Sequence, residues 1–258
     1  MSKKGKNSKS NKMGFKVFLL VVLLALLIGA GIYLLTANKT EAPEQPQLPE
    51  VVETEDVGAP ETEAVQIEQV ETVSMELGYD LTITDIGRYA GVYMEDGSDE
   101  IVSNVLMIVV TNNGDSAVQY AEVSVAAGEE TASFTLSTLP AGESAVLLEQ
   151  NRMEYSADAE YTNGAAQNVA LFAEPLSLCE DQFSIQILDG GFNIINISGE
   201  DITQPITVYY KNCSSDMYYG GITYRVRLEE GMKNEEIKQI MSDHFSAKGS
   251  KIMFVTCG

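Results

Sequence analysis

The sequence predicts an all-β protein held outside a membrane, with two tandem β-sandwiches after a single transmembrane helix and a disordered acidic linker. Three observations predict this. Residues 17–37 are uncharged and mostly apolar, and residues 38–74 are acidic and rich in proline. From residue 75 onward, short runs of alternating apolar residues are separated by Gly, Asn, Asp and Ser. Alternation with a period of two, interrupted by turn residues, is typical of sandwich strands and hairpins.

The apolar run at residues 17–37 predicts a membrane-spanning helix. Its 21 residues, at about 1.5 Å each, match a hydrocarbon core of about 30 Å. Residues 1–16 contain six lysines, and cytoplasmic flanks retain excess positive charge, so they form a basic cytoplasmic tail in this interpretation. A cleaved signal peptide is the alternative, although its apolar region is usually shorter. We expect a single-pass protein of the cell membrane with an extracellular C-terminal part.

Residues 38–74 predict a spacer that does not fold. They contain four of the seven prolines, no aromatic residue and a run of acidic side chains. Such segments are extended and repel themselves, so this one can hold the folded domains away from the membrane. The alternative is a linker without a required length.

The charge of the chain excludes one class of partner. The formal net charge is −22, and all 38 acidic residues follow residue 36. Such a surface repels nucleic acid and anionic membranes, so we expect no nucleic-acid partner. Residues 174–258 have 12 acidic and seven basic residues, which makes them the least repulsive part for an anionic partner.

Two sandwich domains are expected, at residues 75–173 and 174–258. A weak internal repeat supports this division. VLMIVVTNNGDSAVQYAEVSV in the first part aligns loosely with PITVYYKNCSSDMYYGGITYRVRL in the second. Each part has the length of an ordinary sandwich domain.

The run VTNNGDSAVQYAEVSV and the following FTLSTLPAGESAVLLE resemble immunoglobulin-like modules of bacterial surface proteins, of the CARDB and FxLYD kind. In these modules an Asn-Gly type turn is followed by a Leu-Pro-x-Gly-Glu-like turn. Leu139, Pro140, Gly142 and Glu143 match the second turn, and the match weakens at residues 231–235. The resemblance implies two immunoglobulin-like sandwiches on a bacterial envelope protein that serves as a spacer, an adhesive unit or a complex subunit.

Residues 208–228 are the candidate binding region, because they hold five of the twelve tyrosines and three basic residues. Strand alternation places Arg225 and Arg227 on one face. Tyr209 and Lys211 share a face of the preceding strand, so pairing of the two strands can create one exposed aromatic and basic patch. The candidate binding residues are Tyr209, Lys211, Tyr218, Tyr219, Arg225 and Arg227. The alternative is that the tyrosines pack across strands and the arginines balance nearby glutamates.

The three cysteines, Cys179, Cys213 and Cys257, lie in the second expected domain. Outside the membrane a disulfide can persist, and a bridge between Cys179 and Cys257 would join the two ends of that domain. The odd count leaves one thiol over, and sequence alone does not choose the pairing. The alternative is that all three are reduced.

Residues 95–100 form an acidic cluster that can be interpreted as a calcium loop. The candidate ligands are Asp96, Asp99 and Glu100, since calcium prefers carboxylate and carbonyl oxygens. The spacing of a complete calcium loop is missing, and a solvated hairpin tip is the alternative. No metal or cofactor is expected.

The sequence favours a protein that is not an enzyme. His244, the only histidine, adjoins Asp243, but adjacent residues do not form an oriented dyad on a strand. We expect a binding or adhesion protein of the cell envelope that contacts another protein, a glycan or a wall polymer. A structural subunit of a secretion, pilus or transporter complex is the alternative, and an exported hydrolase dependent on His244 is a distant one.

Overall fold

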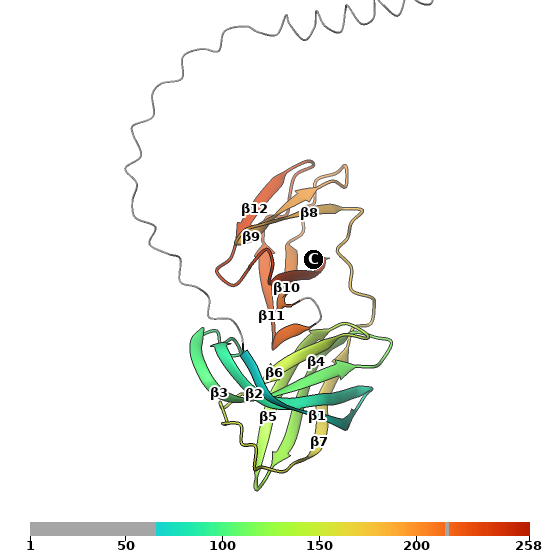
Figure 1. Cartoon of the computed structure of the whole chain (residues 1–258). Helices are drawn as coiled ribbons and strands as arrows, with labels where there is room; N and C mark the ends of the chain where they lie inside the picture. The colour runs from blue at the N-terminus through green and yellow to red at the C-terminus, as the bar shows by residue number, and fades with distance from the viewer. Residues whose placement is uncertain (1–65, 215–216) are drawn as a thin grey trace, which may run out of the picture. The chain divides into compact units, whose positions relative to one another are not determined.

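The computed structural model describes residues 66–214 and 217–258 (Figure 1). These residues are all-β, without a helix, as the sequence predicted for this part of the chain, and they belong to one compact unit. The tail, the expected transmembrane helix at residues 17–37 and most of the spacer lie outside the described residues. Within the described ranges, no helix is long and apolar enough to cross a membrane.

The described part of the chain contains thirteen strands in three sheets. The strands are β1 (Gln66–Gly78), β2 (Leu81–Tyr93), β3 (Glu100–Asn112), β4 (Val118–Ala127), β5 (Glu130–Leu139), β6 (Ser144–Leu148), β7 (Tyr161–Leu171), β8 (Phe183–Leu188), β9 (Gly191–Asn196), β10 (Ile206–Cys213), β11 (Tyr218–Leu228), β12 (Ile237–Met241) and β13 (Ser250–Cys257). One sheet has the order β1-β2-β3-β6-β11-β10-β13, and the others have the orders β5-β4-β7 and β12-β9-β8.

The first half of the described chain packs strands β1-β2-β3-β6 against the sheet β5-β4-β7. Ile108 on β3, Leu147 on β6 and Phe134 on β5 belong to one buried core. Alternate residues of β4, such as Val123 and Val125, are buried in the same core. The alternating pattern in the sequence therefore corresponds to one face turned toward a second layer.

The second half repeats this arrangement with strands β11-β10-β13 against the sheet β12-β9-β8. Its core contains Phe192 and Ile194 of β9, Val208 and Tyr210 of β10, and Val255 of β13.

One short strand pairing joins the two halves into a continuous sheet. Strands β6 and β11 run parallel, with Tyr218 opposite Ala145 and Tyr219 opposite Val146. Four strands of the first half and three of the second thereby form the seven-stranded sheet. The seven-stranded sheet therefore contains strands from both sides of the domain boundary that was expected between residues 173 and 174.

The first strand begins inside the segment that was expected to be a disordered spacer up to residue 74. Strand β1 starts at Gln66 and pairs with β2 along its length. Ile67 and Val73 pack against buried clusters, and Glu68 forms an ion pair with Arg88 of β2. The acidic composition of this segment concealed apolar residues that pack, partly buried, against these clusters.

Asn112, at the end of β3, holds together two turns of the first half. Its buried amide nitrogen donates to the carbonyl oxygens of Ser116 at 2.9 Å, Leu139 at 3.2 Å and Pro140 at 3.1 Å. Its Oδ1 atom accepts a hydrogen bond from the backbone N–H of Gly114 at 3.0 Å.

Asn196, at the end of β9, makes the same set of bonds in the second half. Its amide nitrogen donates to the carbonyl oxygens of Glu200 at 2.8 Å, Met232 at 3.3 Å and Lys233 at 3.0 Å. Its Oδ1 accepts from the N–H of Ser198 at 3.0 Å. Strand β3 therefore corresponds to β9, whereas the sequence alignment had placed β3 on β10 and was wrong by one strand.

Candidate functional site

The candidate binding region forms the antiparallel pair β10 and β11. Tyr209 lies directly opposite Arg225, and Thr207 lies opposite Arg227. Tyr209 and the two arginines therefore share a face, as strand alternation predicted. Arg225 and Arg227 are exposed, and Tyr209 is partly buried.

Lys211 was expected on this exposed patch, but the structure buries it completely. Lys211 lies on the same face of β10 as Tyr209, as predicted, but strand β5 of the first half covers this face at Lys211. The Lys211 ammonium donates to the carbonyl oxygens of Ser137 at 2.7 Å and Gly220 at 3.1 Å. Burial lowers the pKa of Lys211 to about 7, and the nearby Glu95 carboxylate partly opposes this shift.

Glu95 also takes part in this contact between the two halves. Its carboxylate accepts hydrogen bonds from the N–H groups of Gly221 at 2.6 Å and Leu148 at 3.4 Å, and burial raises its pKa. A Cβ atom on Gly221 would lie 1.8 Å from the carbonyl oxygen of Thr135 on β5, so the close approach of the strands requires glycine here.

Tyr218 and Tyr219 were also expected on the patch, and both take part in packing instead. Tyr218 is buried in the core of the first half, and the Lys251 ammonium lies 5.4 Å from the centre of its ring. Tyr219 packs against a separate buried cluster that includes Tyr89 and Met107. Both tyrosines lie where β11 pairs with β6, a pairing that sequence reasoning missed.

Tyr209 and Arg225 remain together and help to line an open cleft of about 440 Å³. The lining residues are Gln119, Thr138, Phe172, Tyr209, Thr223, Arg225, Phe254 and Thr256. Strands β4 and β5 and the segment after β7 supply one side, and β10, β11 and β13 supply the other. The lining contains no carboxylate, although the chain has 38 acidic residues.

The two arginines differ in their electrostatic surroundings. The Arg227 Nε atom pairs with Glu229 Oε1 at 2.9 Å and is not part of the cleft lining. Within the part of the chain that the structure describes, Arg225 forms no ion pair. Arg225 therefore offers the cleft a cation whose charge is not neutralised by a neighbouring carboxylate.

Aromatic rings form the floor of the cleft. Tyr209 stacks on Phe254 with a centroid distance of 4.1 Å and an interplanar angle of 9°. Phe172 meets Phe254 edge to face at 5.2 Å. The sequence did not single out Phe172 or Phe254, because they reach Tyr209 only through the pairing of β10 with β13 and the packing of the two halves.

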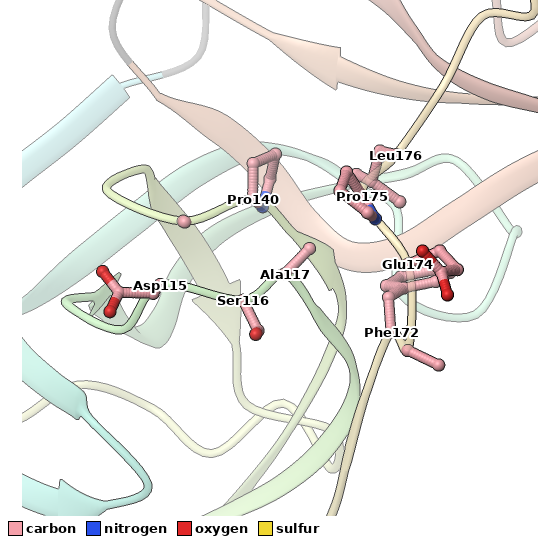
Figure 2. A pocket seen from close by; sticks show the side chains of 10 residues that line it. Asp115, Ser116, Ala117, Pro140, Phe172, Glu174, Pro175 and Leu176 are labelled. Carbon is pink, nitrogen blue, oxygen red and sulfur yellow. The ribbon is translucent and has the colours of Figure 1, made fainter.

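A second pocket, of about 350 Å³, adjoins the cleft through Phe172 (Figure 2). Figure 2 shows Asp115 and Glu174 at opposite sides of the view, with Pro140 and Pro175 between them. Two carboxylates therefore line this pocket, whereas the cleft that shares Phe172 contains Arg225 and no carboxylate.

The residues of the calcium candidate do not converge on a common point. Arg152 pairs with Asp96 at 2.7 Å and with Glu100, whereas Asp99 Oδ2 lies 3.4 Å from His244 Nδ1. Hydrogen bonds from Ser98, supported by Arg152, lower the pKa of Asp96 to about 2. Over the described ranges, no three His, Cys, Asp or Glu side chains form a group able to hold a metal ion.

All three cysteines are free thiols in the structure, so the predicted bridge between Cys179 and Cys257 is not formed in it. The Cys179 thiol lies 3.6 Å from the carbonyl oxygen of Val255. Burial raises the pKa of the Cys257 thiol, and the nearby Cys179 raises it further.

His244 links the loop after β12 to the acidic loop of the first half. Besides contacting Asp99, its ring stacks on Tyr224 at 4.9 Å with an angle of 16°. The neighbouring Asp243 is thus not the carboxylate that faces it.

Comparisons with protein-family models, with curated proteins and with solved structures find no match to this chain.

Proposed function

We propose that the chain is a membrane-anchored, extracellular, non-catalytic binding protein, and that its two immunoglobulin-like modules hold an acidic glycan or wall polymer in the cleft between them. The observation that carries this proposal is the carboxylate-free cleft in a chain of net charge −22, where Arg225 lies opposite Tyr209 and forms no ion pair with any residue that the structure describes.

The lining of the cleft suits a saccharide chain with negative charge. The exposed parts of Tyr209 and Phe172 offer apolar surface for a sugar ring, as aromatic side chains do in many binding sites. Hydroxyl and amide groups of Thr223, Thr256 and Gln119 supply hydrogen-bond donors and acceptors. Arg225 pairs with a carboxylate or phosphate on the ligand.

The arrangement of strands supports the immunoglobulin-like part of the proposal. In the second half, β9 pairs with β8 and β12, and β10 pairs with β11 and β13. The same order of pairings occurs in the first half, with β2, β3 and β6 facing β5, β4 and β7. Two facing sheets whose strands alternate between layers in this way are typical of immunoglobulin-like sandwiches.

The test compares two arginine variants of the full-length protein in detergent. The probe is an oligosaccharide of uronic acids, with a neutral oligosaccharide of the same length as the reference, and binding is measured by calorimetry. We expect Arg225→Ala to weaken binding of the acidic probe at least about tenfold, because a charge-assisted contact is lost.

Arg227→Ala is the matched control, because Arg227 is equally part of the predicted patch but pairs with Glu229 outside the cleft. It should leave the affinity within about twofold of the unchanged protein. Equal losses in both variants, or binding of the neutral probe alone, would contradict the proposed site.

A further inference from the structure

Three of the four prolines in the acidic spacer repeat at a fixed interval. Pro43, Pro46 and Pro49 are each three residues apart in the run PEQPQLPE, which we call the proline segment (residues 43–50). The proline segment lies outside the described residues. A polyproline II helix has three residues per turn, and proline-rich linkers favour this conformation. The interval therefore places the three prolines along one edge of such a helix.

A second edge of this helix carries the negative charge of the proline segment. Glu44, Gln47 and Glu50 are also three residues apart, so they lie along the edge beside the prolines. The remaining proline of the spacer, Pro60, is not part of this repeat. The combination of an apolar edge and an acidic edge is thus confined to the proline segment.

The aromatic floor of the cleft suits the apolar edge. Tyr209 and Phe172 both contact Phe254, with centroid distances of 4.1 and 5.2 Å, so these two rings lie within about 9 Å of each other. Successive prolines of the segment, about 9 Å apart, can therefore each contact one of the two rings. Tyr209 and Phe172 are only partly buried, so part of each ring is accessible. Grooves lined by aromatic side chains are common binding sites for proline-rich segments of this kind.

Charge favours the same occupant. The cleft contains Arg225 and no carboxylate, and Arg225 forms no ion pair with the residues that the structure describes. A glutamate on the acidic edge can pair with its guanidinium through two parallel hydrogen bonds. Because the chain has a net charge of −22, most of its surface repels an acidic segment. The cleft is therefore a favourable place for the proline segment to bind.

The chain between the proline segment and β1 is long enough to reach the cleft. Gln66 begins β1 and pairs with β2 near the end of that strand. Just beyond that end, the Glu95 carboxylate binds the N–H of Gly221 on β11. The path from Gln66 through this contact and along β11 to Arg225 is at most about 45 Å long. The 15 residues between Glu50 and β1 can extend over about 50 Å.

We propose that the proline segment of each chain occupies the cleft of the same chain, with its prolines on Tyr209 and Phe172 and a glutamate on Arg225. The spacer keeps the segment near the cleft, and a tether of this kind gives an effective concentration in the millimolar range. A weak contact is therefore populated. One consequence rests on the proposed function: an acidic oligosaccharide must displace the segment, so docking lowers its apparent affinity.

Crosslinking within the full-length protein in detergent tests the docking without any oligosaccharide. In a chain whose three cysteines are replaced by serine, Gln47→Cys is combined with Gln119→Cys, an exposed position on β4 that lines the cleft. The control combines Gln47→Cys with Thr131→Cys, which is exposed at the other end of the pair β4 and β5. With a short bismaleimide, we expect at least about fivefold more intramolecular product for the cleft pair.

A serine variant tests whether the prolines hold the segment in the cleft. The combined change Pro43→Ser, Pro46→Ser and Pro49→Ser keeps the length and the charge of the spacer. It should reduce the crosslink at the cleft to the level of the control pair. In calorimetry with the oligosaccharide of uronic acids, this variant should bind about threefold more tightly than the unchanged chain, because the cleft is no longer occupied.

The matched control is a second triple serine variant of the same spacer. Val51→Ser, Thr54→Ser and Val57→Ser have the same interval and also leave the charge unchanged. This variant should keep both the crosslink and the affinity of the unchanged chain.

Equal crosslinking of the two cysteine pairs would overturn the docking. A crosslinked dimer in place of the intramolecular product would also overturn it, since the segment would then come from another copy. Docking without a change of oligosaccharide affinity in the proline variant would overturn the competition. A crosslink specific to the cleft, in a protein that does not bind the oligosaccharide, would support the docking and contradict only the proposed function.

Discussion

At the scale of single residues, Asn112 and Asn196 form equivalent hydrogen bonds in the two halves. Each side chain supplies donors to three backbone carbonyl oxygens, from a position that is almost fully buried. Removing the amide takes one hydrogen bond from each of three carbonyl groups and leaves a cavity at a buried position, even where a second donor remains, as the Ile202 N–H does for Met232.

We expect Asn112→Ala and Asn196→Ala each to lower the free energy of unfolding by about 2 to 4 kcal/mol. Urea denaturation followed by circular dichroism measures the change. Asn234→Ala is the control, because its side chain is exposed, and it should change the value by about 0.5 kcal/mol or less. A loss as small as that of the control would show that the amides are dispensable.

Lys211 makes stability depend on pH. Its pKa is about 7 in the folded protein, against about 10.4 in an unfolded chain. Between these values the unfolded chain binds more protons than the folded one, so the free energy of unfolding rises with pH.

Lys211→Met removes this titration. From pH 7 to 9, we expect the unchanged protein to gain stability with a slope of up to about 1.4 kcal/mol per pH unit relative to the variant. Urea denaturation at each pH measures the difference between the two proteins. Parallel curves for both would mean that Lys211 keeps an ordinary pKa.

At the scale of elements, the contact between β5 and β11 depends on Gly221. Gly221→Ala places a methyl group against the backbone of β5, so the strands must separate, and we expect a loss of about 2 kcal/mol or more. Thermal unfolding measures this loss of stability. Gly249→Ala, where a Cβ meets nothing closer than 3.6 Å, is the control. Equal unfolding temperatures for the two variants would show that the strands do not need this close approach.

The strands themselves were predictable from the sequence, whereas the contacts that surround them were predictable only in part. Alternation correctly placed Tyr209 and Arg225 on a common face. It gave no indication that β5 covers Lys211 or that β6 pairs beside Tyr218, because both contacts join residues far apart in sequence. The start of β1 was missed for a related reason, since acidic residues surround its few apolar ones.

At the scale of the whole molecule, a chain anchored by residues 17–37 should present its C-terminal half outside the cell. Cys257 is exposed in the structure. We expect a membrane-impermeant maleimide to label it on intact bacterial cells that make the full-length protein, and Cys257→Ser to lose most of the label. Labelling that appears only after lysis would place this half inside.

The most direct test of the proposed cleft is hydrogen exchange of the full-length protein with and without the acidic oligosaccharide. The account predicts slower exchange in peptides that cover residues 206–212, 222–226 and 253–257, which border Tyr209, Arg225 and Phe254. Exchange in the sheet β12-β9-β8 should not change. Protection confined to other strands, or no protection at saturating oligosaccharide, would contradict the assignment of the cleft as the binding site.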